Sequence, residues 1–316
     1  MERKASSEDK VKALVDKLTE GTVAIFASEK YKQYLSAMSQ FHGYSYNNIL
    51  LILWQNPEAS YVAGYKTWEN LERHVKKGEK GIIILAPCLK KYMKSVPIID
   101  SQTGKLLVDD DGQPITEEKE FTYTKFRPAT VFDISQTEGK ALPTLAEELS
   151  GKVQDYEILM NSIREVAPVP IRFDVWNESK KGYYSLVEKD IVIKSGMSEM
   201  QTIKTAVHET AHSLLHKDTD HLKDSATMEV EAESIAYVVC QSFGLDTSDY
   251  SFGYLAGWSA NKELPELQSS LETIQKTAHM MIGQIEAQIH KRMHQKEHLI
   301  STQELPSIAE SHRHRR

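Results

Sequence analysis

Apolar residues recur every three or four positions over long parts of this sequence, a spacing that predicts helices. One such stretch contains Val11, Leu14, Val15 and Leu18, and a second runs from Ile25 to Phe41. After a turn at His42-Gly43, the stretch YSYNNILLILWQN at 44–56 suits a buried helix, which Pro57 terminates. The first 57 residues therefore predict three helices.

The pattern changes in the next part of the chain. Trp68, Leu71 and Val75 keep helical spacing, a turn at Lys77-Gly78 follows, and GIIIL at 81–85 has the β-branched composition of a strand. Residues 100–118 are rich in Asp, Gly, Ser and Thr, as in a long hairpin loop or an insertion. Residues 119–135 alternate apolar and polar side chains like paired strands.

Residues 136–150 contain Gly139 and Pro143 and show little periodicity before Leu145, so we expect a linker there. A helix (156–166), a strand (171–176), a strand pair (182–194) and further helices follow, including an amphipathic one at 264–290. The polar residues 299–316 predict a disordered tail. We therefore predict an α+β fold with two domains, 1–140 and 151–298.

Length and composition narrow the function classes. At 316 residues the chain exceeds the usual size of one core, which favours two domains. The net charge of -7 gives no bulk attraction to DNA or to an anionic membrane, so a nucleic-acid site must be a local basic patch. The longest apolar run, at 48–54, is too short for a membrane span. The two cysteines, Cys88 and Cys240, lack metal-site spacing and suit reduced thiols in a cytoplasmic protein.

The sequence TAVHETAHSLLHKD at 205–218 contains the pattern H-E-x-x-H. Ser198 followed by Gln201 predicts a helix start, and on that helix His208 and His212 share one face at the spacing that lets two imidazoles bind one zinc ion. Glu209 beside them is placed to act as general base on water. The alternative is a solvated helix face that carries two histidines by coincidence.

A catalytic zinc ion needs a third protein ligand. His216 continues the spacing but lies about 12 Å along the helix from His208, which is too far for one ion. The helix expected at 224–244 is a better source, because Glu229 and Glu233 share one of its faces while Glu231 points roughly opposite. Carboxylates buried on that face would need an ionic partner or a cation.

The H-E-x-x-H helix followed by E-V-E-A-E at 229–233 resembles the gluzincin zinc peptidases, especially the ImmA/IrrE-type metallopeptidases. The resemblance implies peptide-bond hydrolysis with one Zn²⁺, Glu229 as third ligand, and Glu233 as a carboxylate that hydrogen-bonds a ligand histidine. An alternative alignment makes Glu231 the ligand. The resemblance also implies a substrate-lining strand, for which SLVEKDIVIK at 185–194 is suitably placed. Tyr183, Tyr184 and Tyr237 are either stabilisers of the reacting carbonyl or core residues.

Most of residues 8–140 look like the N-terminal domain of ArdC-type antirestriction proteins. The matching features are the Tyr/Asn-rich start of an apolar helix, G-Y-x-x-W, K-K-G-E-K-G before an aliphatic strand, and V-F-D-x-x-Q-T-x-G. This resemblance implies a single-stranded DNA-binding domain, a second metallopeptidase-like domain and a place in a mobile genetic element. It does not imply a membrane partner.

The same half of the chain offers chemistry for single strands. A basic cluster around 66–80 stands among aromatic residues, a combination that binds phosphates and stacks on bases. We predict Trp54 and Trp68 to be core anchors. The residues predicted to contact DNA are Tyr44, Tyr46, Asn47, Lys76, Lys77 and Lys80. The alternative for the turn at 76–80 is a solubilising loop.

Two functional hypotheses follow from the sequence. In the first, the chain binds single-stranded DNA and hydrolyses a peptide or protein substrate. In the second, zinc is structural and the chain protects DNA by binding alone. A third class, a DNA-element protein without metal, would contain no zinc.

Overall fold

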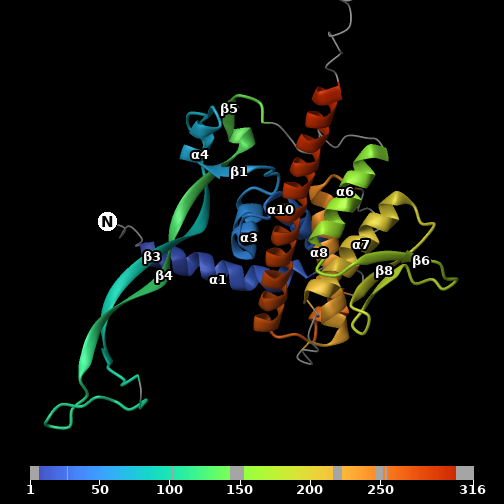
Figure 1. The fold of residues 1–316 in the computed structure, drawn as a ribbon. Coiled ribbons are helices and arrows are strands. Elements are labelled where there is room, and N and C mark those ends of the chain that lie inside the picture. The colour runs from blue at the N-terminus through green and yellow to red at the C-terminus, as the bar shows by residue number, and fades with distance from the viewer. Residues whose placement is uncertain are drawn as a thin grey trace, which may run out of the picture.

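The computed structural model describes residues 7–26, 28–101, 103–142, 153–215, 223–245, 252 and 255–303. Helices form a bundle from which a long β-ribbon extends to one side, and a small sheet lies on the opposite side (Figure 1). The combination is the α+β fold that the sequence predicts.

The helices come from both halves of the chain. They are α1 (Ser7–Ile25), α2 (Ser28–Gln40), α3 (Tyr46–Gln55), α4 (Tyr65–Asn70), α6 (Val153–Val166), α7 (Glu199–Leu215), α8 (Ser225–Ser242), α9 (Leu255–Ser259) and α10 (Leu264–Gln303), with a short 3₁₀ helix η1 (Ile134–Gln136).

The strands form three sheets. They are β1 (Val62–Gly64), β2 (Arg73–Val75), β3 (Ile82–Pro97), β4 (Thr116–Asp133), β5 (Thr137–Gly139), β6 (Ile171–Asp174), β7 (Gly182–Ser185) and β8 (Asp190–Lys194). The first sheet has the order β1-β4-β3, the second pairs β2 with β5, and the third has the order β6-β8-β7. All pairs are antiparallel except β6 with β8.

Helix α8 lies at the centre of the bundle, in contact with α7, α10 and α2. Its apolar residues are fully buried because neighbours cover several of its faces; Val230, Ile235 and Val238 are each 0% exposed. Asp224 caps its first turn by accepting a hydrogen bond from the Thr227 backbone N–H at 2.8 Å. The predicted end of this helix at Gly244 also holds, since Gly244 has a left-handed φ of 69°.

The two halves of the chain share one core. The Tyr31 hydroxyl on α2 lies 2.8 Å from Ser234 Oγ on α8, and both side chains are 0% exposed. Phe26 packs against Trp258, and the His42 carbonyl accepts a hydrogen bond from Gln275 of α10 at 2.8 Å. The amino-terminal helices therefore cover a face of α8 that would otherwise be exposed.

Two side-chain amides on α3 bind the edge of β3. The Asn48 side chain donates to the Leu85 carbonyl at 3.0 Å and accepts from the Leu85 N–H at 2.9 Å. Gln55 makes the same pair of contacts with Ile83, at 2.8 and 2.9 Å. Because β3 has β4 on one side only, these amides replace the hydrogen bonds of a further strand and fix the base of the ribbon.

The stretch V-F-D-x-x-Q-T-x-G at 131–139 has structural roles. Asp133 is 1% exposed and accepts hydrogen bonds from the backbone N–H groups of Ser60 and Tyr61 and from Ser135. Burial raises the pKa of Asp133, but these hydrogen bonds outweigh it and the net pKa is lowered. Thr137 Oγ1 accepts from Arg73 Nε at 2.9 Å, which joins β5 to β2.

The structure corrects several sequence predictions in the first half. Helical spacing at Trp68, Leu71 and Val75 predicted one helix, but α4 ends at Asn70 and Val75 lies in β2. The chain leaves the helix at Glu72, which has a left-handed φ of 57°. Trp68 is a core residue at 0% exposure, whereas Trp54 is 40% exposed and so is not the predicted anchor.

Other differences concern lengths. The strand predicted at 81–85 is the start of β3, which continues to Pro97 because β4 pairs with it throughout. Helix α10 extends to Gln303, so residues 299–303 of the predicted tail are helical. Residues 304–316, and residues 143–150 of the predicted linker, lie outside the described residues. The linker prediction is wrong for residues 137–139, which form β5 because they pair with β2. Among the helices that the structure describes, none is long and apolar enough to cross a membrane.

We predict that Asn48→Ala lowers the free energy of unfolding by about 1 to 3 kcal/mol, because it leaves the buried N–H and C=O of Leu85 without partners. Urea unfolding would measure the loss. Asn47→Ala is the matched control, since the neighbouring Asn47 is only half-buried, and it should cost less. Equal losses in the two variants would contradict the role given to Asn48.

We also predict that stability falls as the pH drops below 6.5. Burial lowers the pKa of His42 from its ordinary value of 6.5. His279, whose Nδ1 lies 3.0 Å from Nδ1 of His42, lowers this pKa further. As the pH falls, the unfolded chain therefore binds a proton at His42 before the folded protein does. The free energy of unfolding decreases until the pH is below the pKa of His42 in the folded protein. In urea unfolding at several pH values, His42→Gln should flatten the decline and His74→Gln, an exposed control, should not.

Candidate metal centre

Helix α7 presents His208 and His212 on one face. Its start is capped as predicted, with Ser198 Oγ accepting from the Gln201 N–H at 3.3 Å. Other sides of the helix are held in the core by buried residues such as Ala206 and Ala211, both 0% exposed. The two imidazoles face each other with their Nε2 atoms 3.1 Å apart.

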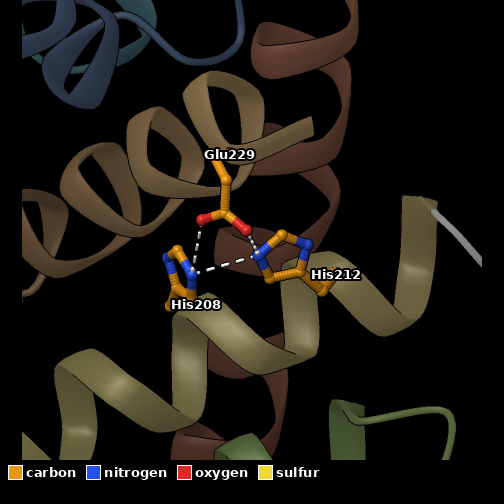
Figure 2. Close-up of side chains that lie close together, drawn as sticks. All are labelled: His208, His212 and Glu229. Atoms are coloured by element: carbon orange, nitrogen blue, oxygen red, sulfur yellow. Dashed lines mark hydrogen bonds and ion pairs between the residues drawn. The ribbon is translucent and has the colours of Figure 1, made fainter. Parts of the chain in front are cut away.

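Glu229 on α8 completes a group of three. One carboxylate oxygen lies 3.6 Å from His208 Nε2 and the other lies 3.4 Å from His212 Nε2. Figure 2 shows the three side chains from two helices pointing toward one another. Their ligand atoms all lie within 4.8 Å of one another, an arrangement that can hold a metal ion.

The donor set fits a divalent cation. Zinc takes imidazole nitrogen and carboxylate oxygen at about 2.0 to 2.2 Å in a tetrahedron, which separates neighbouring ligand atoms by about 3.3 Å. The two Nε2 atoms here are 3.1 Å apart, and two different oxygens of Glu229 lie 3.6 Å from His208 Nε2 and 3.4 Å from His212 Nε2. These separations are close to that value, and two imidazoles and a carboxylate are donor types that a divalent cation accepts.

Glu233 lies one turn after Glu229 and reaches the other side of the His208 ring. Its Oε2 is 3.1 Å from His208 Nδ1, a buried atom. Burial lowers the pKa of His208, but the carboxylates of Glu233, Glu209 and Glu229 outweigh it and the net pKa is raised. The contact at Nδ1 orients the ring with Nε2 toward Glu229.

Glu209 is outside the group of three but beside it. Its side chain is 8% exposed and borders two clefts, of about 320 and 380 Å³, that His208 and Gly182 also line. Burial raises the pKa of the Glu209 carboxyl, and the nearby histidines oppose this without reversing it. The carboxyl group is thus held at the wall of a cleft, next to the candidate ligands.

Strand β7 forms one wall of the clefts. The resemblance implies that residues 185–194 line the substrate, but β8 within that stretch is paired on both sides. Among the described residues both β6 and β7 are edge strands of this sheet, and of these two β7 is the one that lines the clefts. Spacing along the chain does not reveal this order within the sheet, and the role of residues 185–194 toward a substrate stays a prediction.

Gly182 is a site residue that sequence reasoning missed. A Cβ atom there would lie 2.6 Å from Thr205 Cγ2 and 3.3 Å from Glu209 Cγ, so the absence of a side chain lets β7 approach α7. Tyr183 and Tyr184 also line the larger cleft. Tyr237, by contrast, is 4% exposed and packs against Phe252, as a core residue does.

The two candidate third ligands lie in different environments. Glu231, the alternative, is 0% exposed, and its two oxygens accept hydrogen bonds from Lys223 Nζ at 2.8 and 2.9 Å. Glu229 is the one against the histidines. His216, which spacing already excluded, lies outside the described residues.

The residues predicted to contact DNA lie in two places. Tyr44 and Tyr46 are half-buried at the start of α3, where the Tyr44 hydroxyl donates to the Val62 carbonyl at 3.0 Å, and Asn47 is half-buried beside them. The lysines lie on the exposed turn before β3, at Lys76, Lys77 and Lys80. Lys76 Nζ donates to the Ser135 carbonyl at 2.9 Å. Among the described residues, no hydrogen bond or ion pair joins the two groups.

Two family models match different parts of the chain. The family of the N-terminal domain of anti-restriction factor ArdC matches residues 7–132. The IrrE N-terminal-like domain, an M78 peptidase family, matches residues 165–240 and thus includes both histidines and Glu229. The chain is an ArdC-like two-domain protein.

Individual proteins are similar at lower identity. An uncharacterized protein of Bacillus anthracis is 27% identical, with 93% of this chain matched, and the chain spans 54% of that relative's length. The metal-free structure of antirestriction protein ArdC from plasmid R388 is 19% identical (TM-score 0.44), covering 78% of this chain and 85% of that one. Its Mn(II)-bound structure is 16% identical (TM-score 0.47), covering 87% and 97%.

We predict that Lys223→Ala lowers the free energy of unfolding by about 2 kcal/mol or more, because it leaves a buried carboxylate unpaired. The expected loss is smaller than for a fully buried ion pair, because the side chain of Lys223 is 37% exposed. Lys276→Ala is the control: its partner Glu272 is on the surface, and the loss should stay below about 0.5 kcal/mol. Thermal unfolding measures both, and an unaffected Lys223→Ala would show that Glu231 does not depend on this pair.

Proposed function

We propose that the chain binds single-stranded DNA through its amino-terminal half and hydrolyses peptide bonds at the His208 centre with one divalent cation. The observation that carries the hydrolytic part is the convergence of His208, His212 and Glu229 beside the buried carboxyl group of Glu209. The presence of an M78 peptidase-like domain over the same residues supports it. We assign the two activities to residues 151–298 and 1–140.

In this proposal His208, His212 and Glu229 hold the cation, which is Zn²⁺ because two imidazoles and a carboxylate are donors that zinc prefers. A bound cation would supply Lewis acidity and make a neighbouring water molecule more acidic. Glu233 keeps Nδ1 of His208 engaged, so that Nε2 is the atom offered for binding.

Glu209 acts as the general base. Its carboxyl group lies at the wall of the clefts, adjacent to His208 in the chain, and accepts the proton of the attacking water. The same group then delivers the proton to the amine that leaves. The burial of Glu209 restricts access of bulk water to this exchange.

An extended peptide is the substrate form that the cleft accepts. The open edge of β7 offers backbone N–H and C=O groups, to which a peptide adds as a further strand. Gly182 brings this edge close to Glu209, and Tyr183 and Tyr184 border the same cleft. The scissile carbonyl would then lie between the strand and the histidines.

The DNA-binding part rests on the match to the ArdC N-terminal domain. Such a protein would serve a mobile genetic element in antirestriction. The second hypothesis, DNA protection with a structural cation, keeps the ligands but gives Glu209 no chemical role. The two hypotheses therefore differ in the role that they give to the side chain of Glu209.

We predict one zinc ion per chain in the purified protein and in Glu209→Gln, but none in His208→Ala or Glu229→Ala, by elemental analysis. With fluorescein-labelled casein as an unstructured probe, Glu209→Gln should reduce hydrolysis at least about 100-fold, the contribution of a general base. Glu188→Gln, on the exposed turn between β7 and β8, is the matched carboxylate control. It should change neither the zinc content nor the rate of casein hydrolysis. Zinc without hydrolysis in the parent chain would favour the structural-cation hypothesis, and no zinc would refute both.

A further inference from the structure

The ribbon formed by β3 and β4 leaves the body of the protein and extends far from the helices (Figure 1). Its pairing is unbroken from Ile82↔Val131 to Pro97↔Thr116. Residues 89–95 and 117–127 are all exposed, so both faces of this part are in contact with water. Because these side chains do not pack in a core, core packing does not explain their pattern, and the pattern indicates another role.

Opposed residues of antiparallel strands point to the same face of the ribbon, and neighbours along a strand point to opposite faces. One face, called here the basic face, combines cations with aromatic rings. It consists of Lys90, Tyr92, Lys94, Lys119, Phe121, Tyr123, Lys125 and Arg127. Among residues 86–94 and 119–127, this face carries no carboxylate.

The opposite face differs in charge. Its Lys91 forms an ion pair with Glu120 at 2.8 Å, and Glu118 accepts a hydrogen bond from Ser95. The remaining side chains include Leu89 and Met93, which are uncharged. The cationic character of the ribbon is therefore confined to one face.

The basic face also has clear ends. Glu117 follows it on the same side and forms a 2.5 Å ion pair with Lys119, and the loop beyond contains Asp109, Asp110 and Asp111. In a chain of net charge -7, the basic face is thus a bounded positive surface. From residue 119 to 127 it measures about 27 Å at about 3.4 Å per residue, long enough for several nucleotides.

Three aromatic rings stand side by side between the cations. Tyr92 stacks on Phe121 with centroids 5.7 Å apart and meets Tyr123 edge-on at 5.8 Å. Their exposures are 45%, 36% and 49%, so ring surface is open to a ligand. Rings among cations suit unpaired bases, because the bases stack while the phosphates meet the cations.

We propose that the basic face of the β3–β4 ribbon is the single-stranded DNA surface, which rests on the DNA-binding part of the proposed function. Tyr44 and Tyr46, predicted from the sequence, are half-buried and packed against the core. A duplex is the poorer ligand, because its bases already stack on one another and cannot cover the rings. The ribbon holds the strand away from the peptidase clefts.

Two triple variants of the full chain with equal loss of charge test this proposal. One is Lys90→Gln, Lys94→Gln and Lys125→Gln on the basic face, and the other is Lys76→Gln, Lys77→Gln and Lys80→Gln on the turn. The probe is a fluorescein-labelled oligothymidylate, followed by anisotropy at several salt concentrations. The basic-face variant should bind at least about tenfold more weakly and lower the slope of log K against log salt by about 2. The turn variant should change affinity less than twofold.

The aromatic contribution is measured separately. Tyr92→Thr with Tyr123→Thr keeps strand-forming residues and should weaken binding several-fold without changing the salt slope. Circular dichroism checks that each variant folds, and casein hydrolysis should match the parent. The proposal is overturned if both triple variants lose affinity equally, if only the turn variant loses it, or if a duplex of the same length binds as tightly. Failure of the parent chain to bind the oligonucleotide removes the DNA part of the proposed function as well.

Discussion

The burial of α8 on several sides is the constraint on which the candidate site depends. A helix packed against α7, α10 and α2 cannot rotate or slide without opening a cavity, because its apolar side chains interlock with three neighbours. Its orientation therefore decides which carboxylates meet the histidines of α7. The buried hydrogen bond between Tyr31 and Ser234 also holds α8 in this position, because each buried hydroxyl group needs a partner.

The central part of the site was predictable because it depends on helix geometry. A spacing of four residues places His208 and His212 together, and the same rule separates Glu229 and Glu233 from Glu231. The role of Gly182 was not predictable, because it depends on the close approach of β7 to α7, which no local pattern in the sequence encodes. Likewise, the pairing of Glu231 with Lys223 depends on how the chain enters α8.

The fold could be predicted where periodicity was strong and failed where long-range pairing decides. Most helices, the hairpin of β7 and β8, and the α+β class follow from spacing along the chain. The far half of β3 could not be predicted, because its exposed residues become a strand only by pairing with β4. Similarly, β2 exists because β5 lies beside it, and no local pattern indicates that Trp54 remains 40% exposed.

The shared core has a consequence for how such proteins change in evolution. Two units that are separate in sequence are usually exchanged freely, but here the amino-terminal helices cover the face of α8 that contains Ser234. A replacement unit would have to present a matching helical surface and a partner for the Ser234 hydroxyl. The two halves are thus constrained to vary together, although one is assigned to nucleic acid and the other to peptide chemistry.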